Sequence, residues 1–237
     1  MPAKQEIRKK IWDLLEEKDI ARFPRPVHGR IPNFVGAQTA ARKLEELKEW
    51  KNASVIKANP DSPQKWVRKK ALEEGKIVYM AVPRLKKERC FLQINPGKIE
   101  REKAITIRGA FIYGKEVFPW EMKKVDMLVV GSVAVNKKGA RVGKGGGYSD
   151  LEFAIGKEMG IITKNTVVVT TVHPLQVLNV EIPMEKHDVP VDYIITPSGI
   201  IASHTSYKKP DGIYWDIIKK EQIEKIPVLK KLSESIL

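Results

Sequence analysis

The chain has 237 residues, 42% of them hydrophobic and 30% charged, a composition typical of a globular protein and not of a disordered one. No apolar run approaches the roughly 18 residues that cross a bilayer, and no secretory signal is visible, so we exclude a membrane protein and expect a cytoplasmic one. The single cysteine, Cys90, excludes an internal disulfide and a cysteine metal cluster.

The formal net charge is +14, from 43 Lys and Arg against 29 Asp and Glu, and it is unevenly distributed. Residues 1–104 hold 25 basic and 14 acidic side chains, whereas residues 105–237 hold 18 and 15. A basic half is typical of proteins that bind polyanions such as nucleic acid, a nucleotide triphosphate or a polyglutamylated substrate. It is equally typical of a lysine-rich solvated surface, so charge alone does not choose between them.

Helices and short strands are predicted to alternate in the first part of the chain, from apolar residues at helical spacing and short apolar runs. Helices are predicted over Lys4–Lys18, Ala37–Trp50 and Gln64–Glu74, and strands over Ser54–Ala58 and Lys76–Val82. The segment Phe23–Phe34, FPRPVHGRIPNF, contains three prolines and is predicted to be irregular but ordered on the surface.

The strongest predicted strand is Val125–Val135, VDMLVVGSVAV, a nearly continuous β-branched run typical of a strand covered on both faces. A helix over Asp150–Met159, a strand over Val167–Val172 and a late pair over Tyr193–Thr196 and Ile200–Ala202 follow. Alternation of strand, helix and strand favours a parallel sheet with crossover helices. We therefore expect one α/β domain over residues 1–237, a three-layer α/β/α sandwich with a mainly parallel sheet.

A glycine-rich segment, GARVGKGGGYSD, lies between the strongest strand and the helix that follows it. Four of the five residues 143–147 are glycines, which let the backbone approach an anion, and the helix N-terminus adds a positive dipole end. Arg141 and Lys144 supply full charges. The spacing matches neither a Walker A loop nor a dinucleotide fingerprint. The segment predicts a phosphate site, and the alternative is a plain turn in which Ser149 or Asp150 only caps the helix.

These residues resemble the signature of the 5-formyltetrahydrofolate cyclo-ligase family, a hydrophobic strand followed by G-x-R-L-G-x-G-x-G-Y-Y-D. Further segments that resemble the family, in family order, are Lys4-x-x-Ile7-Arg8, Gly75-Lys76 with Val82-Pro83-Arg84, and Ile182-Pro183, His187-Asp188 and Val191-Asp192. The resemblance implies a sandwich of the NagB/RpiA-like type. It also implies that ATP and Mg²⁺ are used to close 5-formyltetrahydrofolate to 5,10-methenyltetrahydrofolate, through phosphorylation of the formyl oxygen.

The resemblance further implies roles for individual residues. Those that would bind ATP are Lys4, Arg8, Arg141, Gly143, Lys144, Gly145, Gly146, Gly147 and Tyr148. Arg141 and Tyr148 would be catalytic, and Tyr148 would also lie near the folate-like substrate. Asp150 and Asp188 would hold Mg²⁺, a hard cation that prefers carboxylate oxygens.

The chain also departs from the family pattern. The second tyrosine is Ser149, the following arginine is Leu151, and the substrate-binding glutamate of an E-x-D/E-T segment has no clear counterpart. Asp61, in NPDSP, falls at about the right distance to replace it as a substrate-binding residue. The proline-rich segment and the G-Y-x-D-L-E variant resemble the divergent methenyltetrahydrofolate synthase domain-containing group. The alternative function is therefore a nucleotide- or RNA-binding protein on a repurposed cyclo-ligase scaffold without folate activity.

Overall fold

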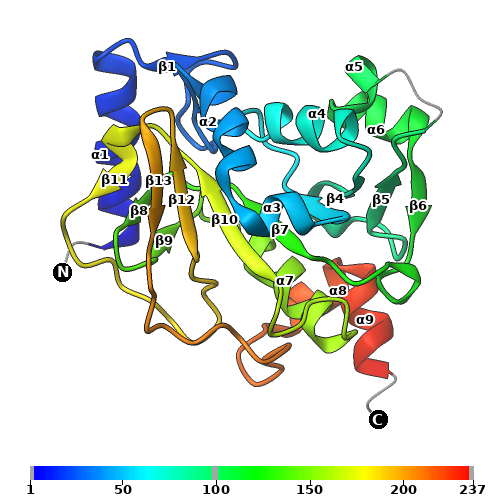
Figure 1. Ribbon diagram of the computed structural model, residues 1–237. Coiled ribbons are helices and arrows are strands. Elements are labelled where there is room, and N and C mark those ends of the chain that lie inside the picture. The colour runs from blue at the N-terminus through cyan, green and yellow to red at the C-terminus, as the bar shows by residue number, and fades with distance from the viewer. Residues whose placement is uncertain (1–2, 98–100, 235–237) are drawn as a thin grey trace.

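The computed structural model describes residues 3–97 and 101–234, and its main feature is an eight-stranded mixed sheet with helices on both faces (Figure 1). In spatial order the strands are β13 (Gly199–Ala202), β12 (Tyr193–Thr196), β10 (Val167–Thr171), β7 (Met127–Val130), β3 (Val55–Ala58), β4 (Ile77–Ala81), β5 (Phe91–Ile94) and β6 (Lys115–Val117). The central strands from β12 to β4 are parallel, and β13, β5 and β6 add antiparallel pairs at the two edges.

Helices cover both faces of this sheet because successive strand residues point to opposite sides. In β3, Ile56 and Ala58 pack with one layer of helices and Val55 packs with the other. The first layer holds α2 (Ala37–Lys43), α3 (Lys48–Asn52), α4 (Lys65–Glu73), α5 (Arg101–Ala104) and α6 (Ile107–Tyr113). The second holds α7 (Tyr148–Glu158) and α9 (Pro227–Glu234), with α8 (Lys220–Lys225) beside α9. The predicted α/β/α sandwich with a mainly parallel sheet is confirmed, and its NagB/RpiA-like type stays a prediction.

A smaller unit packs beside the main sheet. Helix α1 (Lys4–Glu17) lies against a three-stranded sheet of β8 (Ala134–Asn136), β9 (Arg141–Val142) and β11 (Val177–Leu178). Its apolar side chains Ile7, Ile11 and Leu15 recur at helical spacing and are all buried against this unit, as the sequence predicts.

The predicted single strand over Val125–Val135 is wrong, because the run forms two strands in two different sheets. Strand β7 ends at Val130, and β8 begins at Ala134 in the smaller sheet. Gly131 lies at the break, where a Cβ atom would be 2.8 Å from the Ile31 side chain and 3.0 Å from Asp61 Oδ2. A glycine is required here because two other segments approach the backbone at this point.

Two further predictions need correction. The helix predicted over Ala37–Trp50 is interrupted at Leu47, whose backbone is extended (φ −79°, ψ 130°), and α3 begins after it. The segment over Phe23–Phe34 is irregular as predicted, but its ends are paired, since β1 (Ala21–Arg22) and β2 (Asn33–Phe34) form a short antiparallel ladder.

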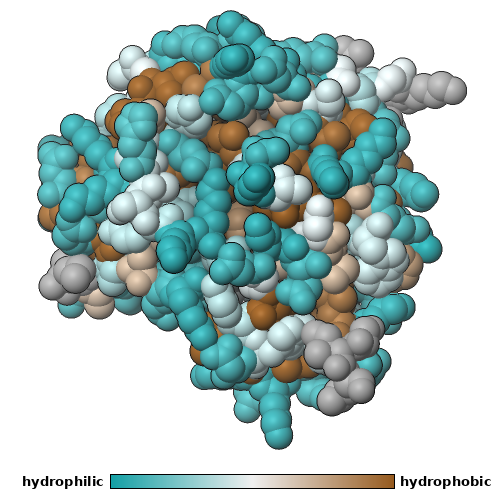
Figure 2. Space-filling view, turned by 60° about the horizontal axis from the view of Figure 1, so that its bottom comes forward, coloured by the Kyte–Doolittle hydropathy of each residue, from teal (hydrophilic) through white to brown (hydrophobic). Residues whose placement is uncertain are grey.

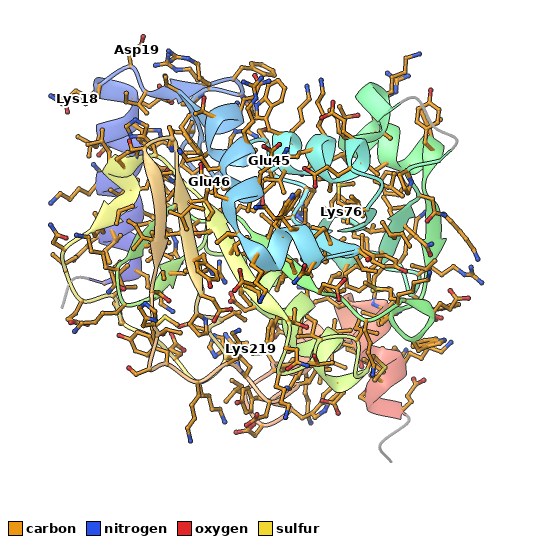
Figure 3. The ribbon with its side chains drawn as sticks, in the orientation of Figure 1. Lys18, Asp19, Glu45, Glu46, Lys76 and Lys219 are labelled. Carbon is orange, nitrogen blue, oxygen red and sulfur yellow. The ribbon has the colours of Figure 1, made fainter. Side chains whose placement is uncertain are left out.

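Lys76 fastens the start of β4 to the helical layer (Figure 3). Its ammonium group is buried and donates to the carbonyl oxygens of Trp50, at 3.0 Å, and Ala53, at 2.9 Å. It also lies 5.3 Å from the centre of the Trp50 ring. Lys76 therefore holds the segment before β3 in place and does not contribute to the cavity described next.

Candidate active site

A cavity of about 700 Å³ lies at the carboxyl ends of β3, β4 and β7. The residues that follow these strands, such as Asn59, Val82 and Gly131, line it directly. Open α/β sheets bind their ligands outside the carboxyl ends of parallel strands, so the position is that of a ligand site.

All residues that the sequence singled out for ATP, metal or substrate line this one cavity. They are Lys4, Arg8, Asp61, Arg141, Gly143, Lys144, Gly145, Gly146, Gly147, Tyr148, Asp150 and Asp188. They come from α1, the segment after β3, strand β9 and the loop that follows it, the first turn of α7 and the segment before β12. The structure thus brings them together, and their individual roles stay predictions.

The glycine loop follows β9 and wraps around Arg8 of α1. The Arg8 Nε donates to the Gly143 carbonyl oxygen at 2.8 Å, and a Cβ on Gly145 (φ +106°) would lie 3.5 Å from the Arg8 guanidinium carbon. Burial lowers the pKa of Arg8, and the Asp188 carboxylate nearby opposes this shift. The loop therefore holds a guanidinium beside its own backbone N–H groups, an arrangement suited to an anion.

Helix α7 begins at Tyr148, so the alternative in which Ser149 or Asp150 only caps the helix is wrong. Its N-cap is Gly147, in the left-handed conformation (φ 67°), and no side chain caps the helix. The Ser149 hydroxyl accepts instead from Asn59 Nδ2 at 3.0 Å. The Ser149 side chain thus contacts Asn59 of the cavity wall instead of capping the helix.

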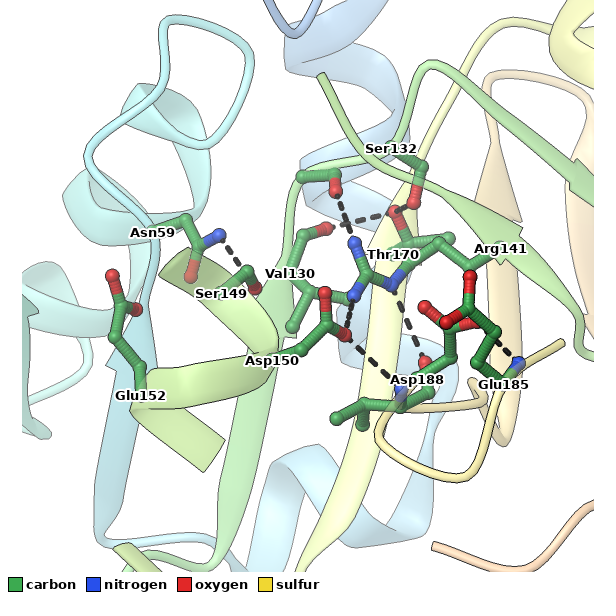
Figure 4. A network of polar contacts seen from close by, with 12 residues as sticks. Asn59, Val130, Ser132, Arg141, Ser149, Asp150, Glu152, Thr170, Glu185 and Asp188 are labelled. Carbon is green, nitrogen blue, oxygen red and sulfur yellow. Dashed lines mark hydrogen bonds and ion pairs between the residues drawn. The ribbon is translucent and has the colours of Figure 1, made fainter. Parts of the chain in front are cut away.

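Arg141 is the buried cation at the centre of the site (Figure 4). Its guanidinium forms an ion pair with Asp150 and donates to the carbonyl oxygens of Gly131 and Val189, both at 3.3 Å. The same Asp150 oxygen, Oδ1, accepts from the Val189 amide at 3.0 Å. The side chain of Arg141 is only 3% exposed, so its direction is fixed by these contacts before any ligand binds.

Asp188 and Lys4 form a second ion pair beside the first. Asp188 Oδ2 accepts from the Lys4 ammonium and from the Glu185 amide, the latter at 2.6 Å. Asp150 and Asp188 each keep one carboxylate oxygen without a hydrogen bond to residues 3–97 or 101–234.

These two carboxylates fit Mg²⁺, which is usually held by one or two carboxylates together with substrate phosphates. Among the residues that the structure describes, no group of three or more His, Cys, Asp or Glu side chains could hold a metal ion. A metal ion here would therefore complete its coordination with water or with oxygen atoms of a substrate.

Asp61 lies on the other side of the glycine loop and pairs with it. Asp61 Oδ1 is 2.8 Å from the Lys144 ammonium. Arg68 stabilises the turn that carries Asp61, because its guanidinium donates to the carbonyl oxygens of Asn59, Pro60 and Asp61. Arg68 is fully buried, and desolvation lowers its pKa to about 10. The position of Asp61 thus depends on the buried guanidinium of Arg68, the fourth residue of α4.

A polar network that the sequence analysis missed lies beneath the cavity. Lys57, in the middle of β3, forms a buried ion pair with Glu152 of α7 and donates to Asn59 Oδ1 at 2.7 Å. Burial raises the pKa of Glu152, and the Lys57 charge opposes this. The available signal was a lysine inside an otherwise apolar strand, VIKA, but its partner is 95 positions away in the sequence.

The family follows from comparison with known proteins. Residues 1–197 match the 5-formyltetrahydrofolate cyclo-ligase family. The chain belongs to this family. A mouse methenyltetrahydrofolate synthase domain-containing protein is 45% identical over 237 residues, which cover 98% of this chain and 63% of that protein. The chain therefore spans less than two thirds of the length of this relative.

Two other proteins are similar over different shares of the chain. A 5-formyltetrahydrofolate cyclo-ligase of Mycolicibacterium smegmatis is 32% identical over 89 residues, 35% of this chain and 42% of that protein. The solution structure of a 5,10-methenyltetrahydrofolate synthetase from Aquifex aeolicus matches with a TM-score of 0.52 and 18% identity, over 86% of this chain and 95% of that one. This second likeness supports the fold. The helices of residues 3–97 and 101–234 include none with the length and apolar character needed to cross a membrane.

Proposed function

We propose that the protein is an ATP- and Mg²⁺-dependent ligase that closes 5-formyltetrahydrofolate to 5,10-methenyltetrahydrofolate. The supporting observation is a cavity lined by two chemically different sets of residues. One set is basic and glycine-rich, with Lys4, Arg8, Arg141 and the glycine loop, and the other follows β3 and β4 and includes Asp61, Val82 and Arg84. The first set suits a phosphate donor, and the second would contact the organic acceptor.

The nucleotide would occupy the end beside α1. The N–H groups of residues 143–147 and the positive end of α7 suit its phosphates. Arg8 and Arg141 add charge from two sides, and both are already positioned by carbonyl oxygens. Preorganised cations of this kind neutralise charge that develops during phosphoryl transfer without needing to reorient.

Mg²⁺ would be held by the oxygens of Asp150 and Asp188 that make no hydrogen bond with residues 3–97 or 101–234. When bound, it supplies charge neutralisation at the phosphates. The ion pairs with Arg141 and Lys4 fix the direction of each carboxylate and offset the negative charge of the two carboxylates.

The reaction requires positioning more than covalent catalysis. The formyl oxygen of the substrate attacks the terminal phosphorus of ATP, and ADP leaves. N10 then attacks the activated formyl carbon and loses its proton, and phosphate departs with the former formyl oxygen. Tyr148, at the start of α7, lines the cavity and would contact the substrate.

Oxygen labelling tests this proposal. Purified protein would be mixed with Mg-ATP and 5-formyltetrahydrofolate carrying ¹⁸O in the formyl group, and the released phosphate analysed by mass spectrometry. The label is expected in the phosphate, and Arg141→Ala is expected to abolish its release. Phosphate without label, released at the rate of methenyl product formation, would exclude phosphorylation of the formyl oxygen.

The alternative of nucleotide or RNA binding without folate activity stays a prediction from charge. Figure 2 shows a face that is mostly hydrophilic, with small apolar areas between polar side chains. Several basic residues of the first half have acidic neighbours, as in Lys9–Asp13 at 2.8 Å and Arg25–Glu16 at 2.7 Å. Such pairs are typical of a solvated surface. The excess charge does not by itself require a polyanion, and the cytoplasmic location also stays a prediction.

A further inference from the structure

A pair of stacked aromatic rings lies outside the cavity, in the segment that follows β6. The ring centres of Phe118 and Trp120 are 4.6 Å apart, and their planes differ by 11°. The segment contacts α9, which Figure 1 shows below β6 at the lower right of the molecule. Neither aromatic residue lines the cavity of about 700 Å³. A stacked pair of this kind can be continued by a further flat ring.

Two cations lie against this stack. The guanidinium carbon of Arg89, just before β5, is 4.6 Å from the centre of the Phe118 ring. The Lys231 ammonium of α9 is 5.1 Å from the centre of Phe118 and 5.5 Å from that of Trp120. Together with the 4.6 Å between the rings, these distances form a nearly equilateral triangle. The ammonium therefore lies beside the stack and not over the outer face of Trp120.

The outer face of Trp120 is open to a ligand. Trp120 is 44% exposed, although Phe118 covers one of its faces. Within residues 3–97 and 101–234, its ring contacts are those with Phe118 and Lys231, and its indole N–H makes no hydrogen bond. An exposed indole with a free face and a cation at its edge suits a flat ring that is joined to an anionic group.

The surface around the stack is basic. Its three segments, residues 86–89, 115–124 and 227–234, carry eight basic and four acidic side chains. Lys87, Arg89 and Lys231 pair with glutamates of the same surface. The other five basic side chains are exposed, and their ammonium groups form no ion pair or hydrogen bond with residues 3–97 or 101–234: Lys86, Lys115, Lys123, Lys124 and Lys230. Such a surplus attracts phosphate or carboxylate groups.

The combination of an open ring and unpaired lysines favours a single-stranded nucleic acid over other polyanions. A base can stack on the indole only where the strand is unpaired, and lysines around the ring can bind the flanking phosphates. An acidic peptide would use the charges but would not need the ring. A second copy of this chain would bring like charges together in a symmetric interface, which is unfavourable.

We propose that the surface formed by Arg89, Phe118, Trp120 and Lys231 binds single-stranded nucleic acid. One base stacks on the outer face of Trp120, and neighbouring phosphates bind the surrounding lysines. Stacking and ion pairing do not distinguish one base from another, so the binding is independent of base sequence. None of the four residues lines the cavity, so this function is separate from the ligase reaction and does not rest on it.

Fluorescence anisotropy of a labelled oligo(U) of about 12 nucleotides tests the inference on the full chain at low salt. The native protein is expected to bind the strand. Trp120→Leu is expected to weaken this binding about tenfold, whereas Trp120→Phe, which keeps a flat ring, is expected to change it less than about threefold. Affinity for a duplex of the same length is expected to be equal in the native protein and in Trp120→Leu. A cooperative thermal transition of each variant confirms that it is folded.

Paired charge variants separate this surface from the general basicity of the chain. Lys123→Gln/Lys124→Gln is expected to reduce the slope of log affinity against log salt concentration by about one, since each phosphate contact of a single strand contributes about 0.7. Lys9→Gln/Lys10→Gln removes two exposed lysines from α1, on the other side of the molecule from β6 in Figure 1, and is expected to leave the slope unchanged. Saturating Mg-ATP is expected to leave oligo(U) binding by the native protein unchanged.

Several results would overturn the inference without affecting the proposed function. Equal binding by the native protein and Trp120→Leu, or equal losses for the single strand and the duplex, would exclude stacking on this ring. Displacement of oligo(U) by Mg-ATP would place the strand in the cavity instead. No binding by the folded native protein would exclude a nucleic-acid surface. A native dimer that Trp120→Leu converts to a monomer in sedimentation would assign the surface to a second copy of the chain.

Discussion

Substitution of Gly139 by alanine tests whether the β8–β9 turn holds Arg141 in place. Gly139 has φ +87°, a conformation that costs other residues about 1–2 kcal/mol. An added Cβ would lie 2.6 Å from the Val191 carbonyl oxygen, 2.9 Å from Thr205 Cβ and 3.0 Å from Ser203 Oγ. The carbonyl oxygen of Gly139 also accepts from the Val191 amide at 2.9 Å, so neither segment moves alone.

The expected loss in the free energy of unfolding of Gly139→Ala is the sum of two effects. The backbone conformation contributes about 1 kcal/mol, and crowding against a backbone oxygen contributes about 2 kcal/mol, since overpacking typically costs 1–3 kcal/mol. A total of about 3 kcal/mol corresponds to a fall in Tm of roughly 6–12 °C for a chain of this size. Because Arg141 lies two positions further on, nucleotide affinity is expected to fall as well.

The assay is thermal unfolding together with nucleotide titration, and the matched control is Gly75→Ala. Gly75 has a similar φ of +76°, but no atom lies within 4 Å of an added Cβ. The free energy of unfolding of this control is expected to fall by only about 1 kcal/mol, and its nucleotide affinity is expected to equal that of the native protein. Equal losses of Tm in the two variants, or unchanged nucleotide affinity in Gly139→Ala, would refute the reasoning.

Three other predictions use the same structure. Arg68→Lys keeps the charge but loses the forked donors that hold the turn of Asp61. KM for the folate is expected to rise severalfold while kcat changes little. An unchanged KM would argue against the turn as part of the site. Burial raises the pKa of the Cys90 thiol to about 12, so a thiol reagent at pH 8 is expected to label it only after denaturation, and rapid labelling of the native protein would contradict its burial. Arg8→Met removes the cation beside the glycine loop. Because a charged contact is lost, the variant is expected to bind ATP about tenfold more weakly when affinity is measured by calorimetry. An ATP affinity equal to that of the native protein would show that Arg8 is not part of the ATP site.

Local patterns were sufficient for the elements that carry strong periodicity. Helix α1 and the strands β3, β4 and β10 lie within one or two residues of their predicted bounds, because each combines a clear apolar pattern with a clear end signal. Strands β5 and β6 were not predicted. They are short and antiparallel, and they extend the sheet beyond β4, since β5 pairs with β4 and β6 pairs with β5.

The failure at Val125–Val135 has a different cause. The run is apolar throughout, and nothing in its composition shows that Gly131 ends one strand and allows the next to join another sheet. The break depends on Ile31 and Asp61, which reach Gly131 from segments 70 to 100 positions away. A hydrophobic pattern reports burial, and it does not report which sheet buries the residue.

The candidate site shows the same contrast between local and distant contacts. The residues predicted to bind phosphate are largely contiguous in the sequence, from Arg141 to Asp150, so their chemistry was visible in one segment. The polar network beneath the cavity depends on contacts between distant elements, above all Lys57 with Glu152. A lone lysine in a strand predicts no partner, and the network becomes visible only when β3 and α7 are packed together.

The central claim is that this cavity closes 5-formyltetrahydrofolate at the expense of ATP. The most direct measurement follows the ultraviolet absorbance of the methenyl product after purified protein is mixed with 5-formyltetrahydrofolate and Mg-ATP. Absorbance is expected to rise only when ATP and Mg²⁺ are both present, and not with Arg141→Ala. No rise with native protein that binds ATP and is fully folded would contradict the claim.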